Sequence, residues 1–202
     1  AFSTVFNFTT ENVVCGVINS TDTPINIPDD NTSGISSSIS VLEDNNKTIT
    51  DVNVTVNISH TWVGDLALTL VSPSGTPVIL SSNNGGEGDG YSNTTFDNDV
   101  TQSITDGIPP YSGVFKPQGD LSTLINEESY GDWILKVVDS GPADIGSIDN
   151  WSIEICGIPV ISNDNDKDGV LNVDDACPNT PLNTVVDATG CPIFSLPSNN
   201  FE

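Results

Sequence analysis

The clearest pattern in the chain is a strict alternation of apolar and polar residues within residues 49–60. Valine or isoleucine stands at every second position from 52 to 58, and Asn, Thr or Ser lies between them. Successive side chains of a strand point to opposite faces of a sheet, so this period predicts a long strand with one buried face.

Shorter segments of the same kind predict further strands, bounded by Gly, Pro, Asn and Asp, at 36–42, 66–70, 78–80, 133–138 and 151–155. Pro73-Ser74-Gly75 predicts a hairpin turn between two of them. No stretch carries a convincing apolar period of 3.6 residues, which an amphipathic helix would show. The sequence therefore predicts an all-β fold, an antiparallel sandwich or jelly roll.

The aromatic residues divide into two expected groups. Trp133 and Trp151 each open an apolar strand, so both are predicted in the core, with their indole N–H groups bonded to buried acceptors. Trp62, Tyr91 and Tyr111 lie in predicted loops and are the candidates for contact with a ligand, with Tyr130 as a further exposed aromatic residue. Packing in the core or within the loops is the alternative to ligand contact.

Residues 164–175 have the ligand spacing of a calcium loop. The candidate ligands at positions 1, 3, 5, 7, 9 and 12 are Asp164, Asp166, Asp168, the Val170 carbonyl, Asn172 and Asp175, and Gly169 stands at position 6. The scaffold is not an EF-hand, because Cys177-Pro178 stands where the exit helix would begin. The alternative is a disordered acidic linker, which is the usual explanation of a charge run.

The composition favours calcium more widely. The net charge is −24, from 28 acidic and 4 basic residues, and 21 of the acids are Asp. Such a charge repels a phosphate backbone, so no nucleic-acid partner is expected. No run reaches the roughly 18 apolar residues of a membrane span, so no membrane insertion is expected. A second calcium site is predicted at Asp65, Asp97 and Asp99, with ordinary turn chemistry as the alternative.

Several spaced motifs identify a family. They are HTWVGDL at 60–66, LVSPSGT at 70–76, NTTFD at 93–97, FKP at 115–117, GDWILKVVD at 131–139 and GSIDNWSI at 146–153. This series, over roughly residues 25–157, resembles the P domain (Homo B domain) that follows the catalytic domain in proprotein convertases and many bacterial secreted peptidases. The resemblance implies a jelly-roll β-sandwich that is not itself catalytic and that stabilises or regulates a neighbouring domain.

The acidic loop and the residues after it resemble a thrombospondin type 3 repeat. The shared features are the Asp-x-Asp-x-Asp-Gly spacing, Cys177-Pro178, Val186-Asp187 and Gly190-Cys191-Pro192. Such repeats wind an acidic chain around calcium and close it with a disulfide, so the resemblance adds Asp187 to the ligands. Asn172 departs from the pattern, which has Asp there, and only one repeat is present.

The cysteines form an even set of four. Cys15 and Cys156 flank the predicted sandwich, and Cys177 and Cys191 lie inside the repeat, so the expected pairs are Cys15–Cys156 and Cys177–Cys191. Two disulfides predict an oxidising compartment, and the chain is expected to be secreted or at the cell surface.

No active site is expected. His60 is the only histidine, and a catalytic triad would need a serine and an aspartate placed precisely around it. The P-domain resemblance also points away from chemistry, so the chain is predicted not to be an enzyme.

The expected organisation is a lead-in at 1–24, a P-like domain at 25–157, a linker at 158–163, a type 3 repeat at 164–193 and a tail at 194–202. The predicted function is that of a non-catalytic, calcium-binding accessory module of a secreted bacterial peptidase or surface protein. Expected partners are neighbouring catalytic or surface domains of the parent protein, the type IX export machinery and glycans. The alternative is an adhesin or carbohydrate-binding module that uses exposed loop aromatic residues.

Overall fold

The computed structural model describes residues 12–160, 164–170, 172, 174–182 and 184–193. The chain divides into two compact units, Ala1–Val160 and Ile161–Glu202. Each unit is a separate body, and the tail predicted at 194–202 lies outside the described residues. None of the described helices is long and apolar enough to cross a membrane.

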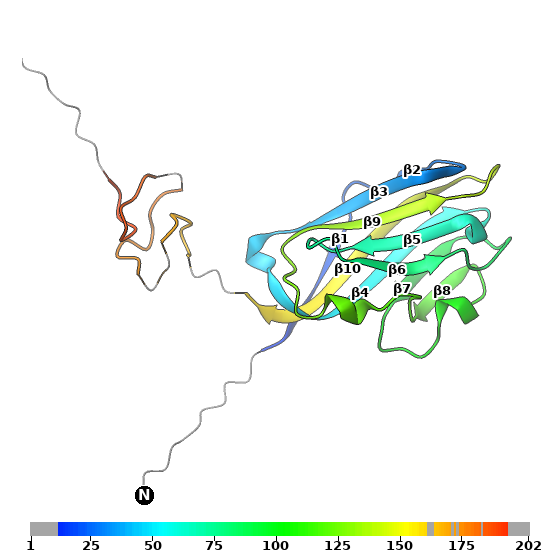
Figure 1. Cartoon of the computed structure of the whole chain (residues 1–202), viewed down its shortest axis with the longest axis horizontal. Helices are drawn as coiled ribbons and strands as arrows, with labels where there is room; N and C mark the ends of the chain where they lie inside the picture. Colours follow the sequence, from blue (N-terminus) through cyan, green and yellow to red (C-terminus); the bar gives the residue numbers. More distant parts are fainter. Residues whose placement is uncertain (1–11, 161–163, 171, 173, 183, 194–202) are drawn as a thin grey trace, which may run out of the picture. The chain divides into compact units, whose positions relative to one another are not determined.

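The first unit is a β-sandwich of two sheets (Figure 1). One sheet has the spatial order β1 (Val14–Asn19), β10 (Gly146–Pro159), β4 (Lys47–His60), β7 (Tyr91–Phe96) and β8 (Tyr111–Phe115), with β2 (Ile25–Ile27) paired to β10 as well. The other sheet has the order β3 (Asn31–Val41), β9 (Gly131–Asp139), β5 (Leu66–Val71) and β6 (Pro77–Ser82). The connections contain the short 3-10 helices η1 (Glu43–Asn45), η2 (Val63–Asp65), η3 (Ile104–Asp106) and η4 (Leu121–Leu124). The all-β prediction is confirmed.

One strand pair departs from the predicted antiparallel arrangement. β7 and β8 run parallel, with Tyr91 opposite Tyr111 and Phe96 opposite Phe115. A tight hairpin can join only antiparallel strands, whereas parallel strands need a long crossover. Residues 97–110, which include η3, supply that crossover between β7 and β8.

The core lies between the two sheets and follows the alternation seen in the sequence. Val52, Val54, Val56 and Ile58 of β4 are all at most 2% exposed. Trp133 and Trp151 are buried as predicted, and each indole N–H finds an acceptor: the first donates to the Ser129 carbonyl (3.0 Å) and the second to the Ser37 hydroxyl (2.6 Å).

The sheet extends to the N-terminal side of the predicted domain boundary at residue 25. β1 lies within the segment predicted as a lead-in, and it pairs with β10 from Val14 opposite Gly157 to Asn19 opposite Ser152. Cys15 and Cys156 stand directly opposite each other in this register and form a disulfide. The chain therefore enters and leaves the sandwich on neighbouring strands, and a covalent bond holds these strands together.

The described part of the second unit consists of turns and one isolated bridge, between Val186 and Pro192. A disulfide joins Cys177 to Cys191, and the Ala176 N–H donates to the Thr189 carbonyl (2.8 Å). Among its described apolar side chains, Val170 and Val186 are half-buried, and Leu182, Val185 and Ile193 are exposed. Among the described residues of this unit, the disulfide and polar contacts hold the chain together, and none belongs to the hydrophobic core cluster.

Candidate calcium site

Three carboxylates converge in the loop at the start of the second unit. Asp164, Asp166 and Asp168 each offer an oxygen, and the three oxygens lie within 4.8 Å of one another. Within the part of the chain that the structure describes, no other three His, Cys, Asp or Glu side chains form such a group. Hard carboxylate oxygens without nitrogen or sulfur are the donor set of calcium rather than zinc.

Backbone N–H groups of this loop donate hydrogen bonds to its own side chains. Asp164 accepts from the N–H groups of Lys167 and Gly169, both at 2.9 Å. Gly169 has a φ of +93°, a conformation that glycine adopts readily and that turns the chain back toward Asp164. The Asn172 side-chain oxygen accepts from the Asn165 N–H (2.9 Å), so Asn172 helps to order the loop.

Several carboxylate oxygens of this unit have no hydrogen-bond partner. Asp166 Oδ1, Asp168 Oδ2 and Asp175 Oδ2 are buried, and none accepts a hydrogen bond. A buried charged oxygen is costly unless a hydrogen bond or an opposite charge compensates it. Three such atoms in one small acidic unit are the arrangement that a bound cation would stabilise.

Asp175 lies against the segment around Gly190. A Cβ atom built on Gly190 would lie 2.1 Å from Asp175 Oδ1 and 3.0 Å from Asp168 Oδ2, so both carboxylates crowd this glycine. The Thr180 N–H donates to Asp166 Oδ2 at 2.5 Å. The segment after the loop thus folds back onto the acidic group, and the Cys177–Cys191 disulfide closes this part of the chain.

The predicted ligand Asp187 lies in the turn that leads to Cys191. Its Oδ1 accepts from the N–H groups of Thr189 (2.8 Å) and Cys191 (3.3 Å) and from the Thr189 hydroxyl (2.7 Å). These hydrogen bonds hold the pKa of Asp187 below its usual range. The converging group of three described carboxylates does not include Asp187, whose Oδ1 stabilises the turn that leads to Cys191.

The structure places the three residues of the second predicted calcium site, Asp65, Asp97 and Asp99, in different surroundings. Asp65 ends η2 and lies close to Gly141, where a Cβ atom would be 2.0 Å from Asp65 Oδ2. Desolvation and the negative charge of Asp139 raise the pKa of Asp65. Asp97 and Asp99 instead lie near Asp51, whose pKa is raised by burial and by these two charges. The three predicted ligands therefore belong to two separate acidic regions.

Two of the three predicted ligand-contact aromatic residues are in the core. Tyr91 is 2% exposed and Tyr111 is fully buried, because parallel pairing of β7 and β8 stacks their rings 5.1 Å apart between the sheets. The Tyr91 hydroxyl donates to Ser81 Oγ at 3.0 Å. Trp62 is 39% exposed, so it remains available at the surface, as does Tyr130 at 54%.

Both ring nitrogens of His60 contact other groups of the sandwich. Its Nε2 lies 3.2 Å from Asp139 Oδ2, and its Nδ1 lies 3.0 Å from the carbonyl oxygen of Trp62. Nε2 therefore contacts a buried carboxylate, and Nδ1 contacts the backbone.

Comparison with known proteins identifies the sandwich. A family model described as proprotein convertase P-domain matches residues 49–155. Leupeptin-inactivating enzyme 1 of Streptomyces exfoliatus is 30% identical over 129 residues, which are 64% of this chain and 24% of that protein. The calcium-dependent protease of Trichormus variabilis is 33% identical over 59% of this chain and 16% of its own length. That of Nostoc sp. is 34% identical over 66% of this chain and 17% of its own length.

The chain spans a quarter or less of the length of these curated relatives. Among solved structures, the serine protease of Aeromonas sobria in complex with its chaperone is similar over 74% of this chain and 28% of that chain, with a TM-score of 0.48 and 22% sequence identity.

Proposed function

The chain belongs to the proprotein convertase P-domain family, and from this premise we propose that it is a non-catalytic, calcium-binding accessory module. The parent would be a secreted peptidase or a cell-surface protein, in which the module stabilises or spaces a neighbouring domain. The names of the relatives support the peptidase setting, since two of them are calcium-dependent proteases. Both disulfides support an extracellular location.

The observation that carries the calcium proposal is the set of buried carboxylate oxygens that accept no hydrogen bond, on Asp166, Asp168 and Asp175. We propose that these three residues and Asp164 supply carboxylate ligands and that Val170 supplies its carbonyl oxygen. The cation would offset the mutual repulsion of the carboxylates. Because no described apolar side chain of this unit is fully buried, the binding energy of the cation would also be its folding energy.

We further propose that residues 164–193 form one thrombospondin type 3 repeat and that the sandwich has jelly-roll connectivity. The repeat assignment rests on ligand spacing together with cysteine spacing. A single repeat of this kind would act as a short, calcium-stiffened connection to a following segment. Export through the type IX machinery is compatible with this arrangement and stays a prediction.

The glycan-binding alternative now has less support. It needs a platform of exposed aromatic side chains, and two of its three candidates, Tyr91 and Tyr111, are buried. Trp62 is the remaining member of that set, and one partly exposed ring is a weak platform for a sugar.

The accessory role is tested with the purified chain, in calcium, against casein and fluorogenic peptides. The expected result is no hydrolysis above that of a blank preparation. Hydrolysis that follows the chain through two independent columns and disappears in the His60→Gln variant would contradict the proposal.

The calcium proposal has its own test in limited proteolysis. Chelation with EGTA should open residues 164–193 to cleavage while the sandwich, with its own core, stays resistant. Equal resistance of this segment with calcium and with EGTA would contradict calcium-dependent folding.

A further inference from the structure

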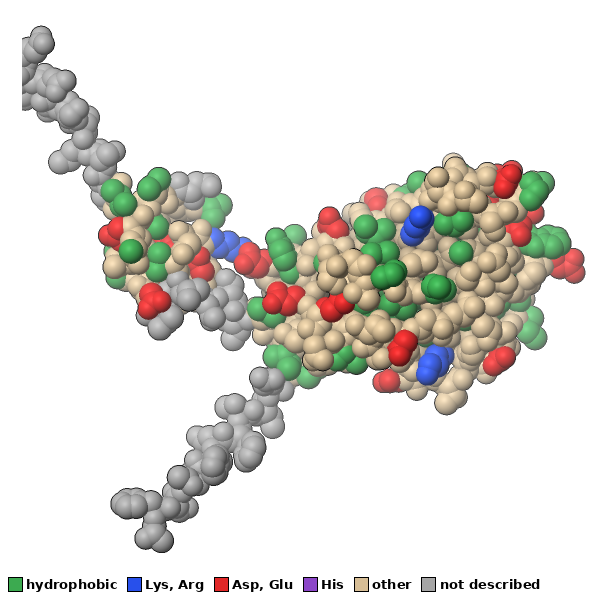
Figure 2. Space-filling view, viewed as in Figure 1, with side chains coloured by type: hydrophobic (Ala, Val, Ile, Leu, Met, Phe, Trp, Pro, Cys, Tyr) green, Lys and Arg blue, Asp and Glu red, His purple; other side chains and the backbone are tan. Residues whose placement is uncertain are grey.

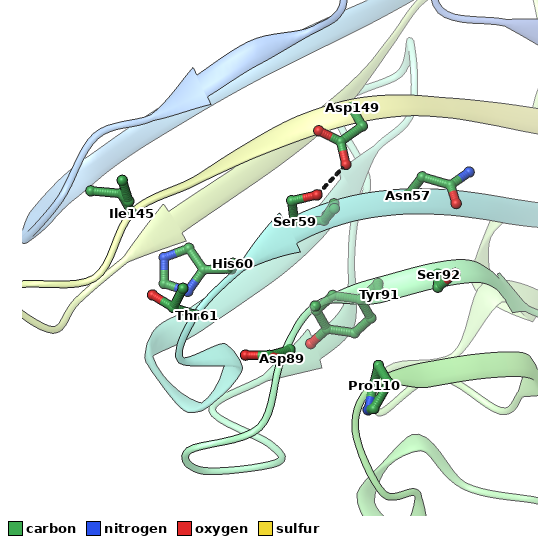
Figure 3. A pocket seen from close by; sticks show the side chains of 12 residues that line it. Asn57, Ser59, His60, Thr61, Asp89, Tyr91, Ser92, Pro110, Ile145 and Asp149 are labelled. Carbon is green, nitrogen blue, oxygen red and sulfur yellow. Dashed lines mark hydrogen bonds between the residues drawn. The ribbon is translucent and has the colours of Figure 1, made fainter.

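A pocket of about 410 Å³ lies where the loop before β7 approaches the outer face of β4 and β10. Figure 3 shows its side chains, which come from several elements. Asn57, Ser59 and Thr61 extend from β4 and its end, Asp149 from β10, and Asp89 from the loop before β7. The pocket lies wholly within the first unit, so it is separate from the proposed calcium loop.

The pocket has two carboxylates, Asp149 and Asp89, and hydroxyl groups hold that of Asp149 in place. Asp149 Oδ2 accepts from Ser59 Oγ (2.6 Å), and Asp149 Oδ1 accepts from Ser147 Oγ (2.5 Å). A carboxylate fixed by two hydroxyl donors loses little conformational freedom when a ligand arrives. Asp149 is therefore preorganised as an acceptor.

No cation of the described chain neutralises these two charges. Within the described residues, neither Asp149 nor Asp89 has a Lys, Arg or His partner within 4 Å. Figure 2 shows that basic side chains are sparse on the visible face of the first unit. With a net charge of −24, the chain would also attract a cationic partner over distance.

Two exposed apolar side chains line part of the pocket. Ile145 is 72% exposed and Pro110 is exposed, and both line the pocket. Ile108, two residues before Pro110, is 82% exposed. A small cation would leave these side chains in water, whereas a polypeptide could cover them and gain apolar contact.

We propose that this pocket receives an arginine side chain from an extended segment of a protein partner. The guanidinium group carries five N–H donors, and the pocket offers the Asp149 and Asp89 carboxylates with the oxygens of Asn57, Ser59 and Thr61 as acceptors. The residues flanking the arginine pack on Ile145 and Pro110. This inference concerns a second site and does not depend on calcium binding by residues 164–193.

The test is NMR titration of the whole chain, with calcium present, against the peptide acetyl-Ala-Ala-Arg-Ala-Ala-amide. The matched control peptide has citrulline in place of arginine, which keeps the shape and removes the charge. Amide signals of residues 57–61, 89–92 and 147–149 should shift with the arginine peptide and stay unchanged with the citrulline peptide.

Three variants assign the effect to the pocket. Asp149→Asn and Asp89→Asn should each weaken binding by about two- to fivefold, the range of a partly exposed ion pair. The double variant should weaken it by roughly tenfold if the two effects add. Asp44→Asn, at the exposed η1, is the matched control and should leave the affinity unchanged. Asp89 lies in an exposed loop, so its variant remains informative if Asp149→Asn disturbs the strand.

Four results would each overturn the proposal. They are the absence of shifts at millimolar peptide, equal binding of the citrulline peptide, shifts spread over the acidic surface that neither pocket variant reduces, and binding of acetyl-arginine-amide as tight as that of the peptide. The last result would assign the pocket to a small cation rather than to a protein segment.

Discussion

His60 of β4 and Asp139 of β9 meet between the two sheets, with Nε2 of His60 3.2 Å from Oδ2 of Asp139. Both side chains are buried. Asp139 Oδ1 also accepts from the Gly141 N–H (3.1 Å), and His60 Nδ1 contacts the Trp62 backbone. One polar contact therefore joins the sheets and fixes the loops that follow both strands.

Removing Asp139 should destabilise the sandwich strongly. Asp139→Ala leaves His60 and the Gly141 N–H buried without an acceptor, so the free energy of unfolding should fall by about 3–5 kcal/mol. Urea unfolding at pH 7 in calcium measures it. Asp44→Ala, at an exposed position, should change it by roughly 0.5 kcal/mol or less. Similar losses in the two variants would contradict the structural role of the buried pair.

The Cys15–Cys156 disulfide should be the largest single covalent contribution to sandwich stability. It closes a loop with a sequence separation of 141. The chain-entropy estimate for a loop of this size is about 5 kcal/mol, against about 3 kcal/mol for the 14-residue separation of Cys177 and Cys191. The Cys15→Ser/Cys156→Ser variant should therefore unfold at lower urea than the wild-type chain. An unchanged midpoint would show that pairing of β1 and β10 does not need the disulfide.

Glu127 should link the stability of the β5–β6 turn to pH. Burial tends to raise its pKa, but hydroxyl hydrogen bonds from Ser74, Thr76 and Ser72 outweigh this and hold the pKa of Glu127 below its usual value. A lowered folded-state pKa stabilises the fold above the unfolded pKa of about 4.3, and this contribution is lost as the pH falls through the folded-state pKa.

The Glu127→Gln variant tests this link. At pH 7 it should cost about 0.5–1 kcal/mol, given the partial exposure of the side chain. Between pH 5 and pH 3 its stability should fall less steeply than that of the wild-type chain, since the ionisable group is gone. Parallel pH profiles from urea unfolding would rule out Glu127 as a source of the acid dependence.

Asp51 should affect the stability of the fold in the opposite direction from Glu127. Burial, followed by the charges of Asp97 and Asp99, raises the pKa of Asp51, so its ionised form disfavours the fold at neutral pH. Asp51→Asn should stabilise the chain by roughly 0.5 kcal/mol at pH 7 in EGTA, and the gain should shrink as the pH falls through the folded-state pKa. If the same variant were destabilised only in calcium, Asp51, Asp97 and Asp99 would hold a cation after all.

The sequence predicts the strands whose pattern is strong and misses those whose pattern is weak. The alternation within residues 49–60 correctly predicts β4, because one face of that strand lines the core along its length. β7 and β8 have polar or glycine residues at many positions, and a 14-residue crossover at 97–110 gives no local sign that the strands run parallel. β1 is an edge strand with mostly exposed side chains, so it has no buried face to reveal it.

The same distinction holds for the candidate sites. Asp164, Asp166 and Asp168 converge within one short loop, so their spacing in the sequence was enough to bring them together. Asp65 and Asp97 are brought to different places by tertiary structure, which local spacing cannot encode. The burial of Tyr91 and Tyr111 likewise follows from strand pairing, and a loop-like sequence around them gave the wrong environment.

Calcium binding by the acidic loop is the central claim, and isothermal titration calorimetry with calcium chloride tests it most directly. The wild-type chain should bind calcium, and Asp166→Asn should weaken or abolish binding, because Asp166 has a buried oxygen without a hydrogen bond. Asp174→Asn makes the same charge change at an exposed position outside the converging group and should bind as the wild-type chain does. No binding by the wild-type chain, or equal weakening by Asp166→Asn and Asp174→Asn, would contradict the account.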